Sequence, residues 1–183
     1  MDPERLVRAS KFLSRHLRHR PDRLGLMLDA GGWVRVSDLL AAVARHGFSI
    51  TPAELEEVVA RNDKQRFSFD ARRMRIGANQ GHSVSVDLEL EPVEPPPVLY
   101  HGTGGHTALA VEREGLRKMR RHHVHLSADS ETARRVGARH GRPVVFEVDA
   151  AAMRAAGYCF FRSPNGVWLV DAVPRRYLRR GCT

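Results

Sequence analysis

A proline-rich segment at residues 91–97, with the sequence Glu-Pro-Val-Glu-Pro-Pro-Pro, most constrains how this chain can fold. Proline fixes its own backbone and lacks an amide hydrogen, so three consecutive prolines continue neither a helix nor the interior of a sheet. They form a stiff, extended spacer instead. Because 183 residues suffice for two small domains, we predict one domain at residues 1–92 and a second at residues 98–183.

The segment before the prolines has the pattern of three helices and a hairpin. Apolar residues recur at helical spacing near the start, and Pro21 closes that first helix. Ser37 is a candidate N-cap for a second helix, and Thr51 with Glu54 forms the capping box of a third. The predicted elements are helices that end near residue 17, at 38–46 and at 52–60, and strands at 66–69 and 74–76. This order is that of a winged helix-turn-helix domain.

After the prolines, short apolar strands alternate with short helices, which predicts an α+β domain. The sequence there lacks G-x-G-x-x-G, a P-loop and C-x-x-C. The predicted strands are 98–101, 123–127, 143–148, 158–161 and 167–170, and the predicted helices are 107–114, 131–140 and a last turn opened by Pro174.

Charge points to polyanionic partners. The formal net charge is +9, which favours nucleic acid or an anionic surface, although an arginine-rich solvated surface is an equal alternative. Two cysteines without close spacing fit a reducing compartment. Because we find no signal peptide and no membrane-spanning stretch, we expect a cytoplasmic protein that does not bind membranes.

The richest stretch chemically is the strand at 123–127, which Arg121 precedes. Alternation directs Val124 and Leu126 to one face and His123, His125 and Ser127 to the other. A polar strand face beside an arginine is a poor core but suits a ligand that carries phosphate. A second strand and its glycine-rich loop, residues 99–105, offer His101, Thr103 and a backbone that a ligand could approach through Gly102. Zinc held by the histidines is a weaker alternative, since no Cys or Glu completes the ligand set.

Three further groups are ambiguous by themselves. Arg18 and His19 close the first helix, where the helix dipole favours cations with or without a function. Lys64 and Arg66 open the hairpin, either as an ordinary charged edge or as contacts to phosphate. The block Asn-Gln-Gly-His-Ser at 79–83 is either a loop or a set of donors toward a ligand, and spacing does not separate the two.

These motifs occur in one order, and as a set the chain resembles the NAD-dependent RNA 2'-phosphotransferases, whose second domain is related to ADP-ribosyltransferases. The motifs are Ser10-Lys11-Phe12-Leu13-Ser14, Leu17-Arg18-His19, Asp63-Lys64-Gln65-Arg66-Phe67, Asn79-Gln80-Gly81-His82-Ser83, Tyr100-His101-Gly102-Thr103, Arg121 with His123-Val124-His125-Leu126-Ser127, and Asn165-Gly166-Val167-Trp168-Leu169.

The resemblance implies a winged-helix lobe followed by an ADP-ribosyltransferase-like lobe that binds NAD+ as co-substrate. In this family an internal RNA 2'-phosphate, as at a tRNA splice junction, attacks the ribose carbon that bears nicotinamide. The neighbouring 2''-hydroxyl of the ADP-ribosylated RNA phosphate then attacks phosphorus. The products are 2'-OH RNA, ADP-ribose 1'',2''-cyclic phosphate and nicotinamide, and no metal is required.

The resemblance also implies roles for particular residues. Catalysis falls to Arg18, His19, Arg66 and Arg121; NAD+ binding to His101, Gly102, Thr103, His125 and Ser127; and RNA binding to Lys64, Arg66 and Arg18. Gly77 stands where the family usually has arginine, and Arg75 lies near but at a different position, so a contact to an anion is lost or replaced. Val167 stands where protein-modifying relatives keep a glutamate.

Side-chain chemistry agrees with these roles. A phosphate monoester is already ionised near neutral pH, so it needs no general base to become a nucleophile. Guanidinium groups stay charged and grip phosphate oxygens in a fork, which stabilises the crowded charge when phosphorus is attacked. His19 titrates in the useful range, and we assign it proton transfer or phosphate orientation in that second step.

Two other hypotheses remain. One is a winged-helix regulator that binds duplex DNA and senses a ligand through its second domain. The other is an enzyme that leaves ADP-ribose on a terminal nucleic-acid phosphate. We expect a monomer with little RNA sequence preference, because sugar and phosphate contacts carry little base information.

Overall fold

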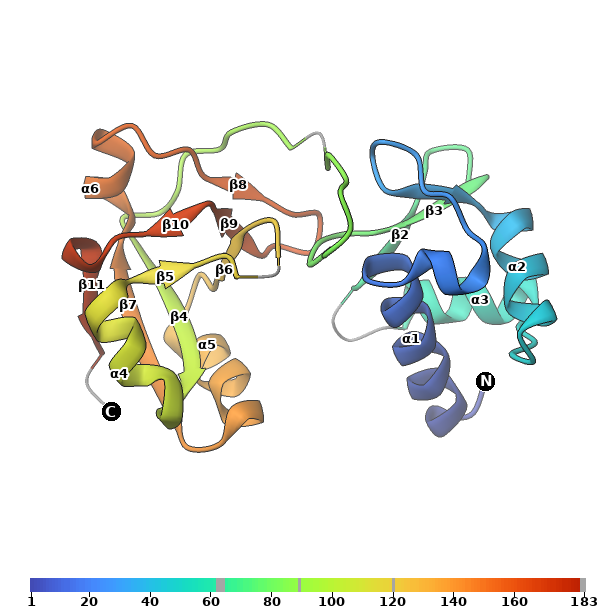
Figure 1. Ribbon diagram of the computed structural model, residues 1–183, viewed down its shortest axis with the longest axis horizontal. Helices are drawn as coiled ribbons and strands as arrows, with labels where there is room; N and C mark the ends of the chain where they lie inside the picture. The colour runs from blue at the N-terminus through green and yellow to red at the C-terminus, as the bar shows by residue number, and fades with distance from the viewer. Residues whose placement is uncertain (62–64, 89, 120, 182–183) are drawn as a thin grey trace. The chain divides into compact units, whose positions relative to one another are not determined.

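The computed structural model describes residues 1–61, 65–88, 90–119 and 121–181, and Lys64 lies outside these ranges. The chain divides into two compact units, Met1–Glu89 and Leu90–Thr183, and each has its own hydrophobic core (Figure 1). Both units combine helices with small antiparallel sheets. In the described part of the chain, no helix is both long enough and apolar enough to cross a membrane.

The first unit contains three helices and a three-stranded antiparallel sheet of order β1-β3-β2. The ladder brings Trp33 opposite Gly77 on one side of β3 and Ser68 opposite Gly77 on the other. The elements, blue to green in Figure 1, are α1 (Pro3–Arg18), η1 (Pro21–Leu24), β1 (Trp33–Arg35), α2 (Val36–Arg45), α3 (Pro52–Ala60), β2 (Phe67–Phe69) and β3 (Arg75–Ala78).

Local sequence accounts for where these helices begin. The Asp2 side chain caps α1, and the capping box of Thr51 and Glu54 at α3 is confirmed. The prediction that Ser37 caps the second helix is wrong. The helix α2 begins at Val36, two residues before the predicted start, and Arg35 occupies the N-cap position without a side-chain hydrogen bond. The reason is the short strand β1, which runs directly into the helix and leaves Ser37 inside its first turn.

The second unit contains one two-stranded and two three-stranded sheets, β10-β5, β11-β7-β4 and β6-β9-β8. Its elements are β4 (Val98–Gly104), α4 (Gly105–Glu114), β5 (Leu116–Arg117), β6 (Val124–Leu126), α5 (Ser130–Gly137), η2 (Ala138–His140), β7 (Pro143–Asp149), α6 (Ala150–Ala155), β8 (Phe161–Arg162), β9 (Trp168–Val170), β10 (Ala172–Val173), η3 (Arg175–Tyr177) and β11 (Leu178–Arg180).

The predicted alternation along β6 is confirmed, because Val124 and Leu126 are buried while His125 is only partly covered. Trp168 lies in the core. The strand predicted at 158–161 is wrong, because the ladder forms only at Phe161–Arg162, opposite β9. A two-residue ladder is set by its partner strand rather than by its own alternation.

Part of the proline-rich segment joins the second unit. Pro92 forms an antiparallel bridge with Phe161, and the Val93 amide donates to the Phe160 carbonyl at 2.8 Å. This short extended stretch therefore adds to the edge of the second unit before the three prolines are reached.

The face of β4 that carries Gly102 and Gly104 packs directly on the backbone of α5 and η2. A Cβ on Gly102 would overlap the Ala133 carbonyl oxygen, and a Cβ on Gly104 would overlap the His140 carbonyl oxygen. Only glycine permits a helix backbone to approach a strand this closely. Because strand residues alternate, His101 and Thr103 occupy the opposite face of β4, away from α5.

Candidate functional site

In the first unit, the structure brings Arg18, His19 and Arg66 together. Arg18 donates from Nη2 to the Arg66 carbonyl at 3.3 Å, and Arg66 donates from Nη1 to Ser10 Oγ at 3.0 Å. Ser10 lies on α1 two turns before Arg18 and is buried. The end of α1 and the residue before β2 are thereby tied to each other.

The block at 79–83 holds this cluster in place. Ser83 donates its amide to the Arg18 carbonyl, and its Oγ lies 2.9 Å from His19 Nδ1. The Asn79 amide donates to the Arg66 carbonyl, and Asn79 Nδ2 donates to the Gln65 carbonyl. Through these contacts the block fixes the main chains of Arg18 and Arg66 and orients the His19 ring.

Gln65 shows how firmly the Arg66 backbone is held. Its φ of 39° lies in the left-handed region, which costs energy for any residue with a side chain. The bond of 2.6 Å that its carbonyl accepts from Asn79 compensates for part of this strain. The predicted phosphate contact of Lys64 lies outside the described residues.

Gly77 lies against Trp33, so a side chain at this position would require the Trp33 ring to shift by a few tenths of an ångström. A Cβ there would lie 3.0 Å from Trp33 Cε3. Arg75, the arginine nearest in sequence, forms ion pairs with Asp29 at 3.0 Å and Asp70 at 3.1 Å. These bonds raise the pKa of the Arg75 guanidinium, chiefly through Asp70. Arg75 therefore fastens the sheet of the first unit.

In the second unit, Arg121, His125 and His101 form one hydrogen-bonded chain. Arg121 Nη1 lies 3.0 Å from His125 Nδ1, and His101 Nδ1 lies 3.0 Å from the His125 carbonyl oxygen. Guanidinium only donates and a carbonyl only accepts, so the proton positions follow. His125 accepts at Nδ1 and carries its proton on Nε2, whereas His101 carries its proton on Nδ1 and keeps a lone pair on Nε2.

The charge state of His101 supports this assignment. Burial lowers the pKa of His101 more strongly than the bond to the His125 carbonyl raises it, and Arg121 lowers it further. His101 is consequently a neutral imidazole at neutral pH, with Nε2 able to accept a hydrogen bond. Burial also lowers the pKa of His123, whose ring lies 5.5 Å from the Phe161 ring.

The strands β4 and β6 meet at a single bridge and then separate. Tyr100 and Ser127 exchange both backbone hydrogen bonds, at 2.9 and 2.7 Å. The next ladder pair would be Gly102 with His125, but the His125 carbonyl bonds the His101 ring instead. By alternation the Gly102 N–H and C=O point to this same edge of β4. They have no hydrogen-bond partner there within residues 90–119 and 121–181.

The remaining site residues have structural contacts of their own. Thr103 Oγ1 lies 2.5 Å from Thr107 Oγ1, which ties β4 to the first turn of α4.

Among the described residues, no group of three or more His, Cys, Asp or Glu side chains is arranged to hold a metal ion. His101 Nδ1 and His125 Nδ1 are both occupied by protein partners.

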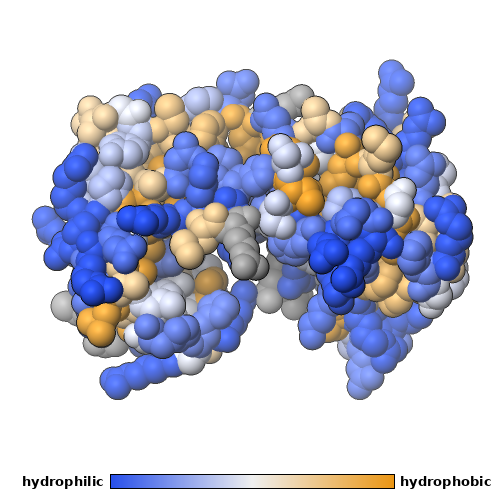
Figure 2. All heavy atoms as spheres, viewed as in Figure 1, coloured by the Kyte–Doolittle hydropathy of each residue, from blue (hydrophilic) through white to orange (hydrophobic). Residues whose placement is uncertain are grey.

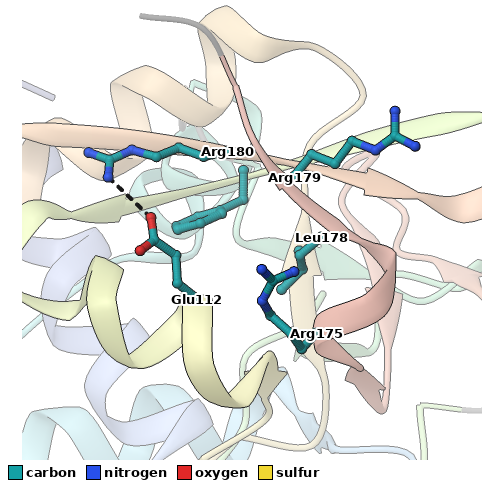
Figure 3. A pocket seen from close by; sticks show the side chains of 6 residues that line it. Glu112, Arg175, Leu178, Arg179 and Arg180 are labelled. Carbon is teal, nitrogen blue, oxygen red and sulfur yellow. Dashed lines mark hydrogen bonds and ion pairs between the residues drawn. The ribbon is translucent and has the colours of Figure 1, made fainter.

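A pocket of about 330 Å³ lies elsewhere in the second unit, between α4 and β11. Figure 3 shows Arg180 turned to Glu112, with which it forms an ion pair of 3.1 Å, while Arg179 extends away from the hollow. None of the residues predicted for catalysis or NAD+ binding lines it; its lining is Glu112, Phe146, Arg175, Leu178, Arg179 and Arg180. We therefore place the candidate site at the two clusters above.

Comparison with known proteins agrees with the motifs. The model of the RNA 2'-phosphotransferase, Tpt1 / KptA family matches residues 4–172. A probable RNA 2'-phosphotransferase of Trichormus variabilis is 61% identical over 178 residues, which cover 97% of this chain and 98% of that protein. Proteins of the same description from Streptomyces griseus and Burkholderia pseudomallei are 58% and 52% identical, over 97% and 94% of this chain and 98% and 94% of their own lengths.

The match extends through both units and spans all the described site residues. The chain belongs to the RNA 2'-phosphotransferase family.

Proposed function

We propose that this protein transfers an internal RNA 2'-phosphate to NAD+ and releases 2'-OH RNA, ADP-ribose 1'',2''-cyclic phosphate and nicotinamide. The observation that carries the proposal is the hydrogen-bonded cluster of Arg18, His19 and Arg66, in a chain of this family. Two guanidiniums and an imidazole form a site for a dianionic phosphate, since arginine stays charged and binds phosphate through parallel donors.

The first unit is proposed to be a winged-helix lobe, with β2 and β3 as the wing. We propose that this lobe does not bind nucleic acid as a DNA-binding helix-turn-helix domain does. In such a domain the second helix of the helix-turn-helix enters the major groove. Here that helix is α3, which has three glutamates and no cation. A helix without cations has no side chain to pair with DNA phosphates, which disfavours the alternative of a duplex-DNA regulator.

The second unit is proposed to be the ADP-ribosyltransferase-like lobe. At the edge where β4 and β6 separate, the Gly102 N–H and C=O match the donor and acceptor of a carboxamide such as that of nicotinamide. The lone pair on His101 Nε2 matches a ribose hydroxyl. Ser127, directly after β6, and Thr103 on β4 flank this edge. NAD+ bound there supplies an electrophilic ribose carbon with a good leaving group.

The protein's own groups then have little covalent chemistry to perform. Arg18 and Arg66 orient the RNA 2'-phosphate as an already ionised nucleophile, and positioning accounts for much of the first step. Arg121 neutralises charge when the ribose 2''-hydroxyl attacks phosphorus, and His19 handles the proton of that hydroxyl.

A single incubation tests the proposal. An RNA with one internal 2'-phosphate is mixed with NAD+ and the purified protein, and the products are separated by mass. Free nicotinamide, 2'-OH RNA and the cyclic phosphate of ADP-ribose are expected. A stable ADP-ribosylated RNA end would favour transfer to a terminal phosphate, and unchanged RNA and NAD+ would overturn both enzymatic hypotheses.

A further inference from the structure

A row of cations lies along one side of α1, on the surface of the first unit. Lys11 and Arg15 are exposed, and Arg18 follows one turn later. Residues three or four apart on a helix lie one above the other, so these three form a stripe. The opposite side of the helix is buried in the core through Ala9, Leu13 and Leu17. Figure 2 shows hydrophilic side chains, in dark blue, gathered over the part of this unit where α1 lies.

The stripe differs from the other cations of α1 in its partners. Arg5 is fixed to Glu54 by bonds of 2.6 and 3.0 Å, and this pairing lowers the pKa of Glu54 to about 2. Arg8 lies 3.9 Å from Glu4. Within the described ranges, neither Lys11 nor Arg15 forms an ion pair. Their charge is therefore available to a molecule outside the chain.

The spacing and the endpoint of the stripe define the occupant. One helical turn, about 5.4 Å, separates successive cations, and the stripe ends at Arg18 beside His19. If one phosphate of a nucleic-acid strand binds beside Arg18 and His19, the neighbouring phosphates of that strand would lie along α1. The other helix of the fold that could face a polyanion, α3, has no cation between Pro52 and Ala60 to pair with a phosphate.

We propose that Lys11 and Arg15 bind the backbone phosphates of the nucleotides next to the one that carries the 2'-phosphate, so that α1 is a track for single-stranded RNA. This inference rests on the proposed function and names the part of the substrate that α1 recognises. The contact is independent of base identity, because phosphate contacts carry no sequence information.

The test compares two substrates of the full-length protein. One is a single-stranded RNA of about ten nucleotides with a central 2'-phosphate, and the other is a dinucleotide with the same 2'-phosphate and no flanking phosphates. The variants are Lys11→Gln, Arg15→Gln and the pair together. The matched control is Arg45→Gln, which removes an equally exposed arginine from the last turn of α2.

The double variant should raise the KM for the longer RNA about 10-fold, from two exposed phosphate contacts of ordinary strength. The slope of log affinity against log salt should fall by about 1.4, since each contact on a single strand contributes about 0.7. The KM for NAD+, the kcat, and all constants for the dinucleotide should match those of Arg45→Gln.

Two results would overturn the track. One is a double variant that handles the longer RNA as the control does. The other is an equal loss with the dinucleotide, which would mean that the stripe acts through Arg18 rather than through flanking phosphates. Failure of the proposed function would be recognised separately, because the wild-type protein would then release no nicotinamide with either substrate. RNA affinity is measured independently of activity, by fluorescence anisotropy.

Discussion

The Arg121 guanidinium donates to the Nδ1 atom of His125 across 3.0 Å, four residues along the chain. This bond requires an unprotonated Nδ1, since guanidinium has no acceptor. The carbonyl of the same His125 holds His101 in its Nδ1-protonated form. One residue therefore orients the proposed phosphate-binding arginine with its side chain and the proposed ribose-binding histidine with its main chain.

Replacement of His125 should separate these two tasks. His125→Ala removes the acceptor for Arg121 and should lower kcat/KM for the RNA about 3- to 10-fold, the net value of one ordinary hydrogen bond at a solvent-accessible position. His125→Asn places an amide oxygen near the position of Nδ1 and should retain most of the activity. The main-chain bond to His101 survives in both variants, so a higher KM for NAD+ would report the loss of the His125 side chain from the NAD+ site rather than a displaced His101. Equal kcat/KM values for the wild type, His125→Asn and His125→Ala would mean that the contact between His125 and Arg121 has no role in turnover.

The arginines themselves should be far less tolerant. Arg18→Ala, Arg66→Ala and Arg121→Ala should each lower kcat/KM at least ~10²-fold, the usual cost of removing one preorganised charge partner. Arg66→Lys should also fail if the phosphate contact is bidentate. Ser10→Ala removes one anchor of Arg66 and should cost about 3- to 10-fold. A near-normal kcat/KM of any of the three arginine-to-alanine variants would remove that arginine from the set.

Local sequence features led to the correct prediction of the capping box and of the buried side of β6, because capping and alternation depend on neighbouring residues. The serines that hold Arg66 and His19 in place could not be predicted in this way, because each contact joins residues far apart in the sequence. Ser10 and Arg66 are 56 residues apart, and His19 and Ser83 are 64 apart. No local pattern distinguishes these serines from solvated ones, so only the fold identifies them.

Gly102 shows a second limit of the sequence. Its pattern suggested a backbone that a ligand approaches, whereas its Cβ side is filled by α5. The helix that demands glycine lies some thirty residues further along the chain, beyond any local signal. The open N–H and C=O edge of the same residue follows only from the point where β4 and β6 separate.

Gly102→Ala should disrupt the second unit. The added methyl would overlap the main-chain carbonyl of Ala133, which no rotamer change can move, so α5 must shift. We expect a Tm several degrees lower and a higher KM for NAD+. The matched control is Gly105→Ala, where the nearest atom lies at an ordinary contact distance of 3.5 Å and alanine favours the helix. Equal Tm values for the two variants would contradict the close packing.

Titration of His101 should make stability depend on pH. Its pKa is lowered in the folded protein by burial, so the unfolded chain binds the proton first, near pH 6.5. The contribution of His101 to stability is therefore complete above this value and declines as the pH falls toward its folded pKa, by at most ~1.4 kcal/mol per pH unit.

His101→Asn keeps a donor for the His125 carbonyl but does not titrate. The free energy of unfolding, from urea melts at pH 7.5 and 5.5, should decrease less in this variant than in the wild type. The pKa values of Glu54 and Asp129 are lowered, so these carboxylates stay ionised between pH 7.5 and 5.5. An identical decrease in both proteins would show that His101 is protonated in the folded state.

Gly77→Arg, which introduces the residue usual in the family, should not improve the enzyme. The side chain would enter the space of the Trp33 ring, 3.0 Å from the position of Cβ, and overpacking of this kind costs about 1–3 kcal/mol. We expect a lower Tm and an unchanged or higher KM for RNA. In a Trp33→Ala background the same substitution has room, so its effect on the free energy of unfolding should shrink, as a double-mutant cycle would measure. A Gly77→Arg protein with wild-type Tm and a lower KM for RNA would mean that Trp33 yields readily and that the arginine reaches an anionic ligand.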